Sequence, residues 1–145
     1  MTEEQVATIP DDELMRLIRI ILIARASSGM AHHDLDPDVR PVSGSISFEE
    51  GRLGLDGLPG ALASNGGSSE LATLYERLGA QEVAACLRRI GDPRDEQATA
   101  SWAAALEAKG LHQTLQQTLH RAGLERARAA WVRAHPQAFV RLASR

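Results

Sequence analysis

Side chains able to bind a metal gather in one short stretch of the chain. It holds two histidines and three carboxylates: His32, His33, Asp34, Asp36 and Asp38. Histidine and aspartate are common metal ligands, and the D-x-D-x-D spacing is similar to the start of a calcium-binding loop. Such a loop needs glycine at its sixth position and glutamate at its twelfth, where this chain has Val39 and Ser45. We therefore expect no metal site, and interpret the stretch as a solvated loop or as an acidic contact surface for a protein.

Other arrangements that support catalysis are missing from the sequence. There is no Gly-x-Ser-x-Gly motif, and the single cysteine, Cys86, lies in the apolar stretch EVAACLRRI, which is typical of a buried thiol. His112 and His120 would lie about 12 Å apart along a helix, too far to share one ion. The segment SNGGSSE precedes a helix but lacks the Gly-Lys-Ser/Thr of a phosphate-binding loop. We expect a protein without catalytic residues and without a cofactor.

Charge is unevenly distributed along the 145 residues. The formal net charge is only -3, yet residues 1–70 hold 12 acids and 5 bases, while residues 71–145 hold 7 and 11. An acidic surface suits a basic protein partner, and we add Glu49 and Glu50 to the candidate residues of that surface. The alternative explanation for the uneven charge is that these residues lie on solvated helix faces. The arginines of the second half are not interleaved with aromatic residues, so we expect no direct contact with nucleic acid.

The apolar segments are too short for a membrane span. The run LMRLIRIILIA has about half the length that a span needs, and two arginines interrupt it. The amino terminus, MTEEQVATIPDDE, is acidic and has neither the basic nor the apolar region of a signal peptide. These features predict a cytoplasmic protein that does not contact the membrane.

A strongly apolar helix is predicted from Asp11 or Asp12 to Arg25. Leucine and isoleucine recur on one helical face, and further apolar residues, among them Ile20 and Ile23, cover much of the remaining surface. Such a helix is either buried at the centre of the fold or has a core face and a second face for a partner. In the second case we expect a homodimer with Ile20 and Ile23 at its interface.

Glycines, prolines and capping residues divide the rest of the chain into short elements. We expect helices over residues 68–78, 81–90, 95–108, 111–122, 124–134 and from Pro136 onward. Residues 27–45 have no helical period and predict an exposed loop, while the alternation of Ile46 and Phe48 with serines is compatible with a small β-hairpin near residues 45–55. The chain is thus predicted to be a single, mainly α domain over residues 1–145, an irregular bundle of six to seven helices.

Two segments of the chain carry a family resemblance. DGLPGALASNGGSSELATLYERLGAQEVAACLRRI and, near the carboxyl terminus, WVRAHPQAF resemble the bacterial family described as DNA-mimic-protein C-terminal-like, a domain of unknown function, over residues 52–140. The residues that match its pattern are Asp56, Gly57, Ser64, Asn65, Gly79, Trp131, His135, Pro136 and Phe139. The chain departs from this pattern at Leu58 and Pro59, which replace a glycine and a phenylalanine, and the aliphatic Leu62-Ala63 replaces an aromatic pair.

The resemblance implies an α-helical fold in which the matched residues are structural. Together with the missing catalytic motifs and the acidic residues, it favours a non-enzymatic protein-binding module, first of all an inhibitor or an immunity/antitoxin-like protein. Two alternatives remain open. One is a DNA mimic that regulates a DNA-binding protein. The other is a small-ligand binder or enzyme whose pocket lies between residues 56–67 and the carboxyl-terminal helices, with Asn65, His135 and Arg88 as its polar groups.

Overall fold

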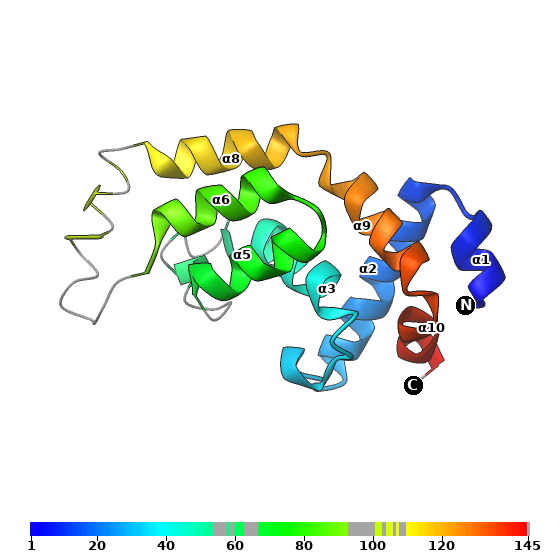
Figure 1. Ribbon diagram of the computed structural model, residues 1–145. Coiled ribbons are helices and arrows are strands. Elements are labelled where there is room, and N and C mark those ends of the chain that lie inside the picture. Colours follow the sequence, from blue (N-terminus) through cyan, green and yellow to red (C-terminus); the bar gives the residue numbers. More distant parts are fainter. Residues whose placement is uncertain are drawn as a thin grey trace. The chain divides into compact units, whose positions relative to one another are not determined.

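The computed structural model describes residues 1–53, 58, 60–62, 67–92, 101, 102, 104, 105, 107 and 110–144 (Figure 1). These residues form an all-α structure, and none of them lies in a strand, which confirms the predicted fold class. Seven of the described helices have seven residues or more, in agreement with the predicted six to seven. The chain divides into two compact units: a terminal unit (residues 1–43 and 124–145) and a central unit (residues 44–123). That residues 1–145 form a single domain stays a prediction.

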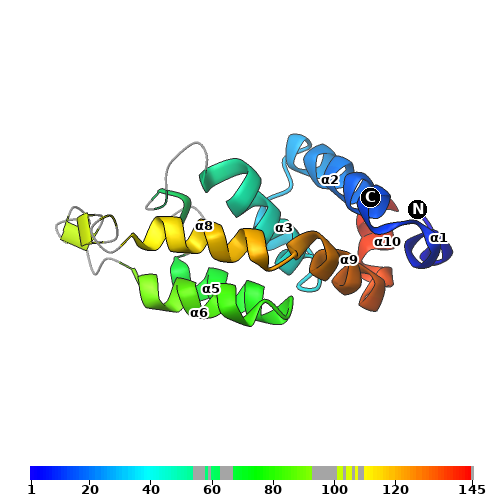
Figure 2. The same cartoon turned by 90° about the horizontal axis from the view of Figure 1, so that it is seen from above.

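Helices from both ends of the chain build the terminal unit. They are α1 (Glu3–Thr8), α2 (Asp11–Ser27), the short 3-10 helix η1 (His32–Asp34), α9 (Leu124–Ala134) and α10 (Pro136–Ser144). α2, α9 and α10 pack against one another, and α1 packs against α9 and α10 (Figures 1 and 2). Leu14 and Ile18 of α2, Val132 of α9 and Phe139 of α10 have no exposed surface. The core of this unit is therefore assembled from residues more than a hundred positions apart in the sequence.

Local sequence signals explain where α1 and α2 begin. The Thr2 hydroxyl accepts a hydrogen bond from the backbone N–H of Gln5 (3.2 Å), and the Gln5 side chain accepts one from the backbone N–H of Thr2 (2.9 Å). This reciprocal pair is a capping box. α2 follows Pro10 and has acids in its first turn, where the helix dipole favours negative charge. α1 is absent from the predicted helices, although the segment TEEQ has the residues of this capping box.

The central unit contains the π-helix η2 (Ser47–Arg52), α5 (Ser68–Arg77), α6 (Gln81–Ile90) and α8 (Leu111–Arg121). α5 and α6 lie side by side and α8 contacts α6 (Figures 1 and 2). Gly79 joins α5 to α6 with a φ of 82°, a left-handed conformation that favours glycine, so the predicted helix junction lies here. Tyr75, Leu87 and Leu115 are fully buried and bring α5, α6 and α8 into one core.

The predicted β-hairpin near residues 45–55 is wrong. The chain runs from α3 (Arg40–Ile46) into η2, and Leu53 is also helical. Side chains with no exposed surface recur every third residue, as on one face of a helix: Val39, Val42, Ser45 and Phe48. Ser45 is buried but polar, so the apolar residues of the sequence do not show the helical period. What remains visible in the sequence is the alternation of Ile46 and Phe48 with serines.

The predicted exposed loop over residues 27–45 is correct for most of residues 28–39 and wrong for residues 40–45, which belong to α3. Only residues 28–39 connect α2 to α3, and they include η1. Leu35 is buried in this connection and Val42 is buried in α3. Pro41, which favoured a loop, lies in the first turn of α3, where the missing N–H of proline is tolerated.

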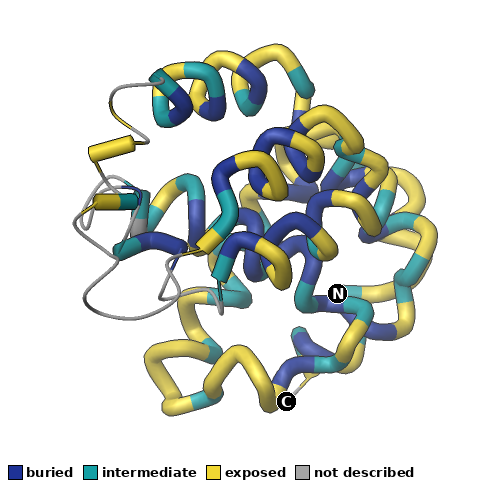
Figure 3. The backbone as a smooth tube through the Cα atoms, turned by 60° about the vertical axis from the view of Figure 1, so that its left-hand side comes forward, coloured by how far each residue is buried: buried dark blue, intermediate teal, exposed yellow. Residues whose placement is uncertain are grey.

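α2 is apolar nearly all round but is not buried all round. Leu14, Met15 and Ile18 are buried, whereas Ile20 is 58% exposed and Ile23 is 66% exposed. The described residues therefore favour the alternative of a core face and a second, exposed face. Figure 3 shows buried and exposed residues alternating in this way along most helices. In the part of the chain that the structure describes, no helix combines the length and the apolar character needed to cross a membrane.

Candidate partner-binding surface

The five predicted partner-binding acids are divided between the two units. Asp34, Asp36 and Asp38 belong to the terminal unit, in the connection of residues 28–39, which we call the acidic loop. Glu49 and Glu50 belong to η2 in the central unit. The acidic loop carries three of the five candidate residues.

Side chains hold the backbone of the acidic loop. The indole Nε1 of Trp131, in α9, donates a hydrogen bond of 2.7 Å to the carbonyl of Asp38. The guanidinium of Arg40 donates to the carbonyls of Leu35 (3.1 Å) and His33 (2.9 Å). Backbone carbonyls outside regular helices need partners of this kind when they are shielded from water. Three carbonyls of the loop are thereby tied to side chains of the terminal unit.

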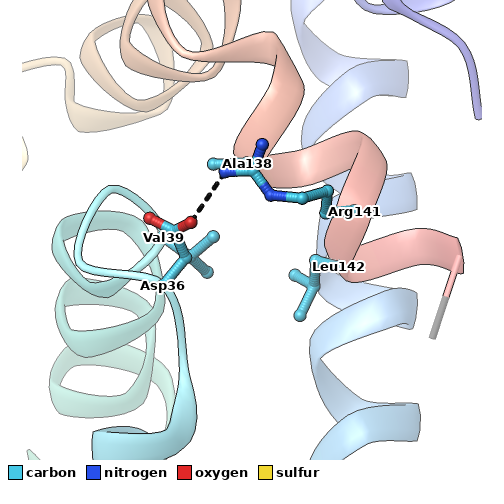
Figure 4. Close-up of a pocket in the computed structure, with 5 residues that line it drawn as sticks. All are labelled: Asp36, Val39, Ala138, Arg141 and Leu142. Carbon is cyan, nitrogen blue, oxygen red and sulfur yellow. Dashed lines mark hydrogen bonds and ion pairs between the residues drawn. The ribbon is translucent and has the colours of Figure 1, made fainter.

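Asp36 connects the acidic loop to α10. One of its carboxylate oxygens lies 2.8 Å from Nη2 of Arg141, and the other accepts a hydrogen bond of 2.9 Å from the backbone N–H of Asp38. The pair closes a small hollow lined by Asp36, Val39, Ala138, Arg141 and Leu142 (Figure 4). Its empty volume is about 190 Å³ with open solvent included, below the ~300 Å³ at which small-molecule sites begin. The hollow is therefore too small for a substrate-sized ligand.

Asp34 is the most exposed acid of the loop, with 51% of its side chain accessible. Its carboxylate accepts a hydrogen bond of 2.9 Å from the backbone N–H of Ala31 and lies 3.4 Å from Nε2 of His33. The first contact fixes the start of η1, and about half of the side chain remains accessible to solvent. Of the three acids, Asp34 is the one best placed to meet a partner.

Glu49 and Glu50 of η2 differ in their surroundings. The hydroxyl of the fully buried Tyr75 donates a hydrogen bond of 2.7 Å to Oε2 of Glu49, and Phe48 meets the Tyr75 ring edge-on at 6.4 Å. Glu49 thus satisfies a buried polar group, which stabilises the central unit. Glu50 is exposed. Solvent access therefore makes Glu50, rather than Glu49, a candidate for contact with a partner.

The matched residues near the carboxyl terminus form one cluster. The rings of Trp131 and His135 are stacked, with centroids 4.0 Å apart, and Nδ1 of His135 lies 2.9 Å from the carbonyl of Trp131. Pro136 begins α10, and Phe139 is buried in the core. Trp131 is also the residue whose indole donates to the carbonyl of Asp38. The structure therefore brings together two residues that the sequence prediction assigned to separate features.

The remaining matched residues cannot be placed in the same way. Asp56, Gly57, Ser64 and Asn65 lie outside the described residues. Asn65 was also one of the polar groups of the alternative ligand pocket. Of its other two, His135 stacks on Trp131 in the terminal unit, and Arg88 pairs with Glu76 in the central unit. The ligand pocket stays a prediction.

The described residues offer no metal centre or reactive thiol. No group of three or more His, Cys, Asp or Glu side chains among them is arranged to hold an ion. Cys86 is buried, as the sequence predicts. Burial, opposed by the charge of Arg89, raises the pKa of its thiol, which disfavours the reactive thiolate.

Several arginines of the terminal unit form hydrogen bonds with residues of the same unit. Arg19 of α2 donates to both carboxylate oxygens of Glu125 (2.8 and 2.6 Å), and the buried Arg128 donates to the same carboxylate (3.0 Å). Hydrogen bonding from Arg19, with a further contribution from Arg128, holds the pKa of Glu125 below its usual value against the opposing effect of burial. This cluster joins α2 to α9.

Two more arginines contact residues near the two ends of the chain. Arg25 donates to the carbonyls of Leu142 (2.9 Å) and Ala143 (3.1 Å), near the carboxyl end of α10. Arg133 donates to the carbonyl of Ile9 and pairs with Asp11 at the start of α2. With Arg40 and Arg141 included, most of the arginines of the unit therefore have carbonyl or carboxylate partners within it.

Carboxylates at the amino ends of α1 and α2 remain exposed without an ion pair to any described residue. They are Glu3, Glu4, Asp12 and Glu13, and with Asp34 we call them the outer acids. The terminal unit contains equal numbers of carboxylate side chains and arginines. Its described solvent-facing charge is nevertheless acidic, because seven of its acids are exposed but only three of its described arginines, Arg16, Arg126 and Arg141. The sequence prediction omitted the four acids at the helix starts, although the acid excess of residues 1–70 includes them.

No family model, no curated protein and no solved structure matches this chain. The family resemblance of residues 52–140 therefore stays a prediction, and the functional argument depends on the chain itself.

Proposed function

We propose that this chain is a non-enzymatic protein-binding module that docks on a protein with a basic surface, as an inhibitor or an immunity/antitoxin-like protein does. The observation that carries the proposal is the distribution of charge in the terminal unit. Most of its described arginines donate to carbonyls and carboxylates of the same unit, and the outer acids face solvent. The outer acids are therefore available for a partner.

Exposed carboxylates support association in a specific way. They remain hydrated before binding, so presenting them costs little, and they attract a basic surface over about the 8 Å Debye length of physiological salt. Such attraction mainly raises the association rate and selects against acidic partners. It also makes binding sensitive to ionic strength, which gives the proposal a measurable consequence.

The contacts of the acidic loop support the same proposal. Trp131 and Arg40 tie its carbonyls, and Arg141 pairs with Asp36. A loop that is already ordered loses less conformational entropy when a partner binds. Asp34 is presented on this ordered segment, so it would contribute to binding without first folding the loop.

The two alternative functions have less support. A DNA mimic would present a surface dominated by carboxylates to a DNA-binding protein, but the exposed Arg16 and Arg126 interrupt the acidic surface of the terminal unit. A small-ligand binder or enzyme needs a cavity; the hollow beside Asp36 is too small, and the predicted pocket includes residues outside the described part of the chain. A basic protein partner in general is therefore favoured over either narrower function.

A second candidate, self-association, is favoured by one observation. Ile20 and Ile23 are large apolar side chains on one face of α2, and both are more than half exposed. Burying them against a second copy would be favourable, at about 25 cal/mol for each Å² removed from water. Two isoleucines alone are far less than the ~800 Å² per partner of a stable interface, so this candidate ranks second.

Affinity capture from the native cell lysate tests the proposal. The wild-type chain is compared with a neutral variant that carries Glu3→Gln, Glu4→Gln, Asp12→Asn and Glu13→Gln. These substitutions leave the capping pair of Thr2 and Gln5 in place. We expect one stoichiometric protein partner with the wild-type chain and its loss with the neutral variant.

A matched control keeps the result interpretable. The double variant Arg16→Gln and Arg126→Gln changes exposed charges of the opposite sign in the same unit. It should retain the partner, and circular dichroism should show that all variants are folded. Equal capture by wild type and neutral variant would contradict the proposal, and so would capture of nucleic acid in place of a protein.

A further inference from the structure

We draw no further inference here: the strongest candidate, the exposed apolar face of α2 around Ile20 and Ile23, goes no further than the self-association already considered, because nothing in the structure shows what covers it.

Discussion

The indole of Trp131 donates a hydrogen bond of 2.7 Å to the backbone carbonyl of Asp38, a residue 93 positions earlier in the chain. This contact fastens the acidic loop to α9. Elsewhere in the same unit, arginines donate hydrogen bonds to carbonyls and carboxylates of the unit. The consequences can be measured one contact at a time.

Replacing Trp131 by Phe should loosen the acidic loop. Phenylalanine keeps an aromatic ring beside His135 but leaves the Asp38 carbonyl without its donor, at a cost of about 1–3 kcal/mol of unfolding free energy. Hydrogen exchange at residues 34–39 should become faster. Trp102→Phe is the control, since its indole donates to the Ile90 carbonyl in the central unit (3.1 Å) and should leave the loop unchanged. Unchanged exchange in Trp131→Phe would show that the contact does not order the loop.

The Asp36–Arg141 pair should contribute little to stability. More than half of the Arg141 side chain and 26% of the Asp36 side chain are exposed, so the coupling energy in a double-mutant cycle should lie below about 1 kcal/mol. Asp36→Ala should cost more than Arg141→Gln, because it also removes the acceptor for the backbone N–H of Asp38. Urea unfolding of the two single variants and the double variant measures both quantities. A larger effect of Arg141→Gln would contradict this ranking.

We expect the stabilising effect of Glu125 to be lost in acid. Its folded pKa lies below its unfolded value near 4.5, so its stabilising effect is complete above that pH and is lost as the pH falls through the folded pKa. Glu125→Gln should therefore lower the unfolding free energy at pH 7, by about 1–3 kcal/mol because the buried Arg128 loses a charged partner. The difference from wild type should shrink as the pH falls through the folded pKa of Glu125. A difference for Glu125→Gln that stays constant as the pH falls would refute the assignment.

In the central unit, we expect Glu49 to have a structural role and Glu50 to be a surface residue. Tyr75→Phe removes the hydroxyl that bonds to Glu49 and should cost about 0.5–1.5 kcal/mol. Glu49→Ala should destabilise the chain by a similar or larger amount, since it removes the acceptor to which the buried hydroxyl donates. Glu50→Ala changes an exposed position and should destabilise the chain less than either of the other two substitutions. Thermal unfolding of the three variants tests the distinction, which fails if Glu50→Ala is the most destabilised.

Self-association through α2 makes a prediction of its own. If the exposed face binds a second copy, Ile20→Ser with Ile23→Ser should shift a dimer to a monomer in sedimentation experiments without loss of helix content. Ala24→Ser is a control at a neighbouring exposed position. A wild-type chain that is monomeric at all concentrations would eliminate the second candidate.

The sequence predicts the helices well where apolar periodicity coincides with strong stop signals. The bounds of α6 and α9 agree with the predicted 81–90 and 124–134, because Gly79, Gly91 and Gly123 interrupt the chain beside them with positive φ. α3 and η2 escaped prediction because a serine occupies one of their buried positions. Tertiary packing, and not local propensity, decides such a segment.

The candidate surface is less predictable than the helices. The sequence identifies the acids, but it does not show that Asp36 and Glu49 have partners within the chain, because Arg141 and Tyr75 are distant in sequence. The same holds for Trp131 and Asp38. Which acids face solvent therefore depends on long-range contacts that no local pattern contains.

The most direct test of the central claim is the rate at which the captured partner associates with the wild-type chain as ionic strength is raised. Attraction by the outer acids predicts that this rate falls steeply with salt, and that the neutral variant starts from a lower rate and depends less on salt. A rate that is independent of salt, or the same salt dependence in both proteins, would contradict the claim that the acidic surface guides binding.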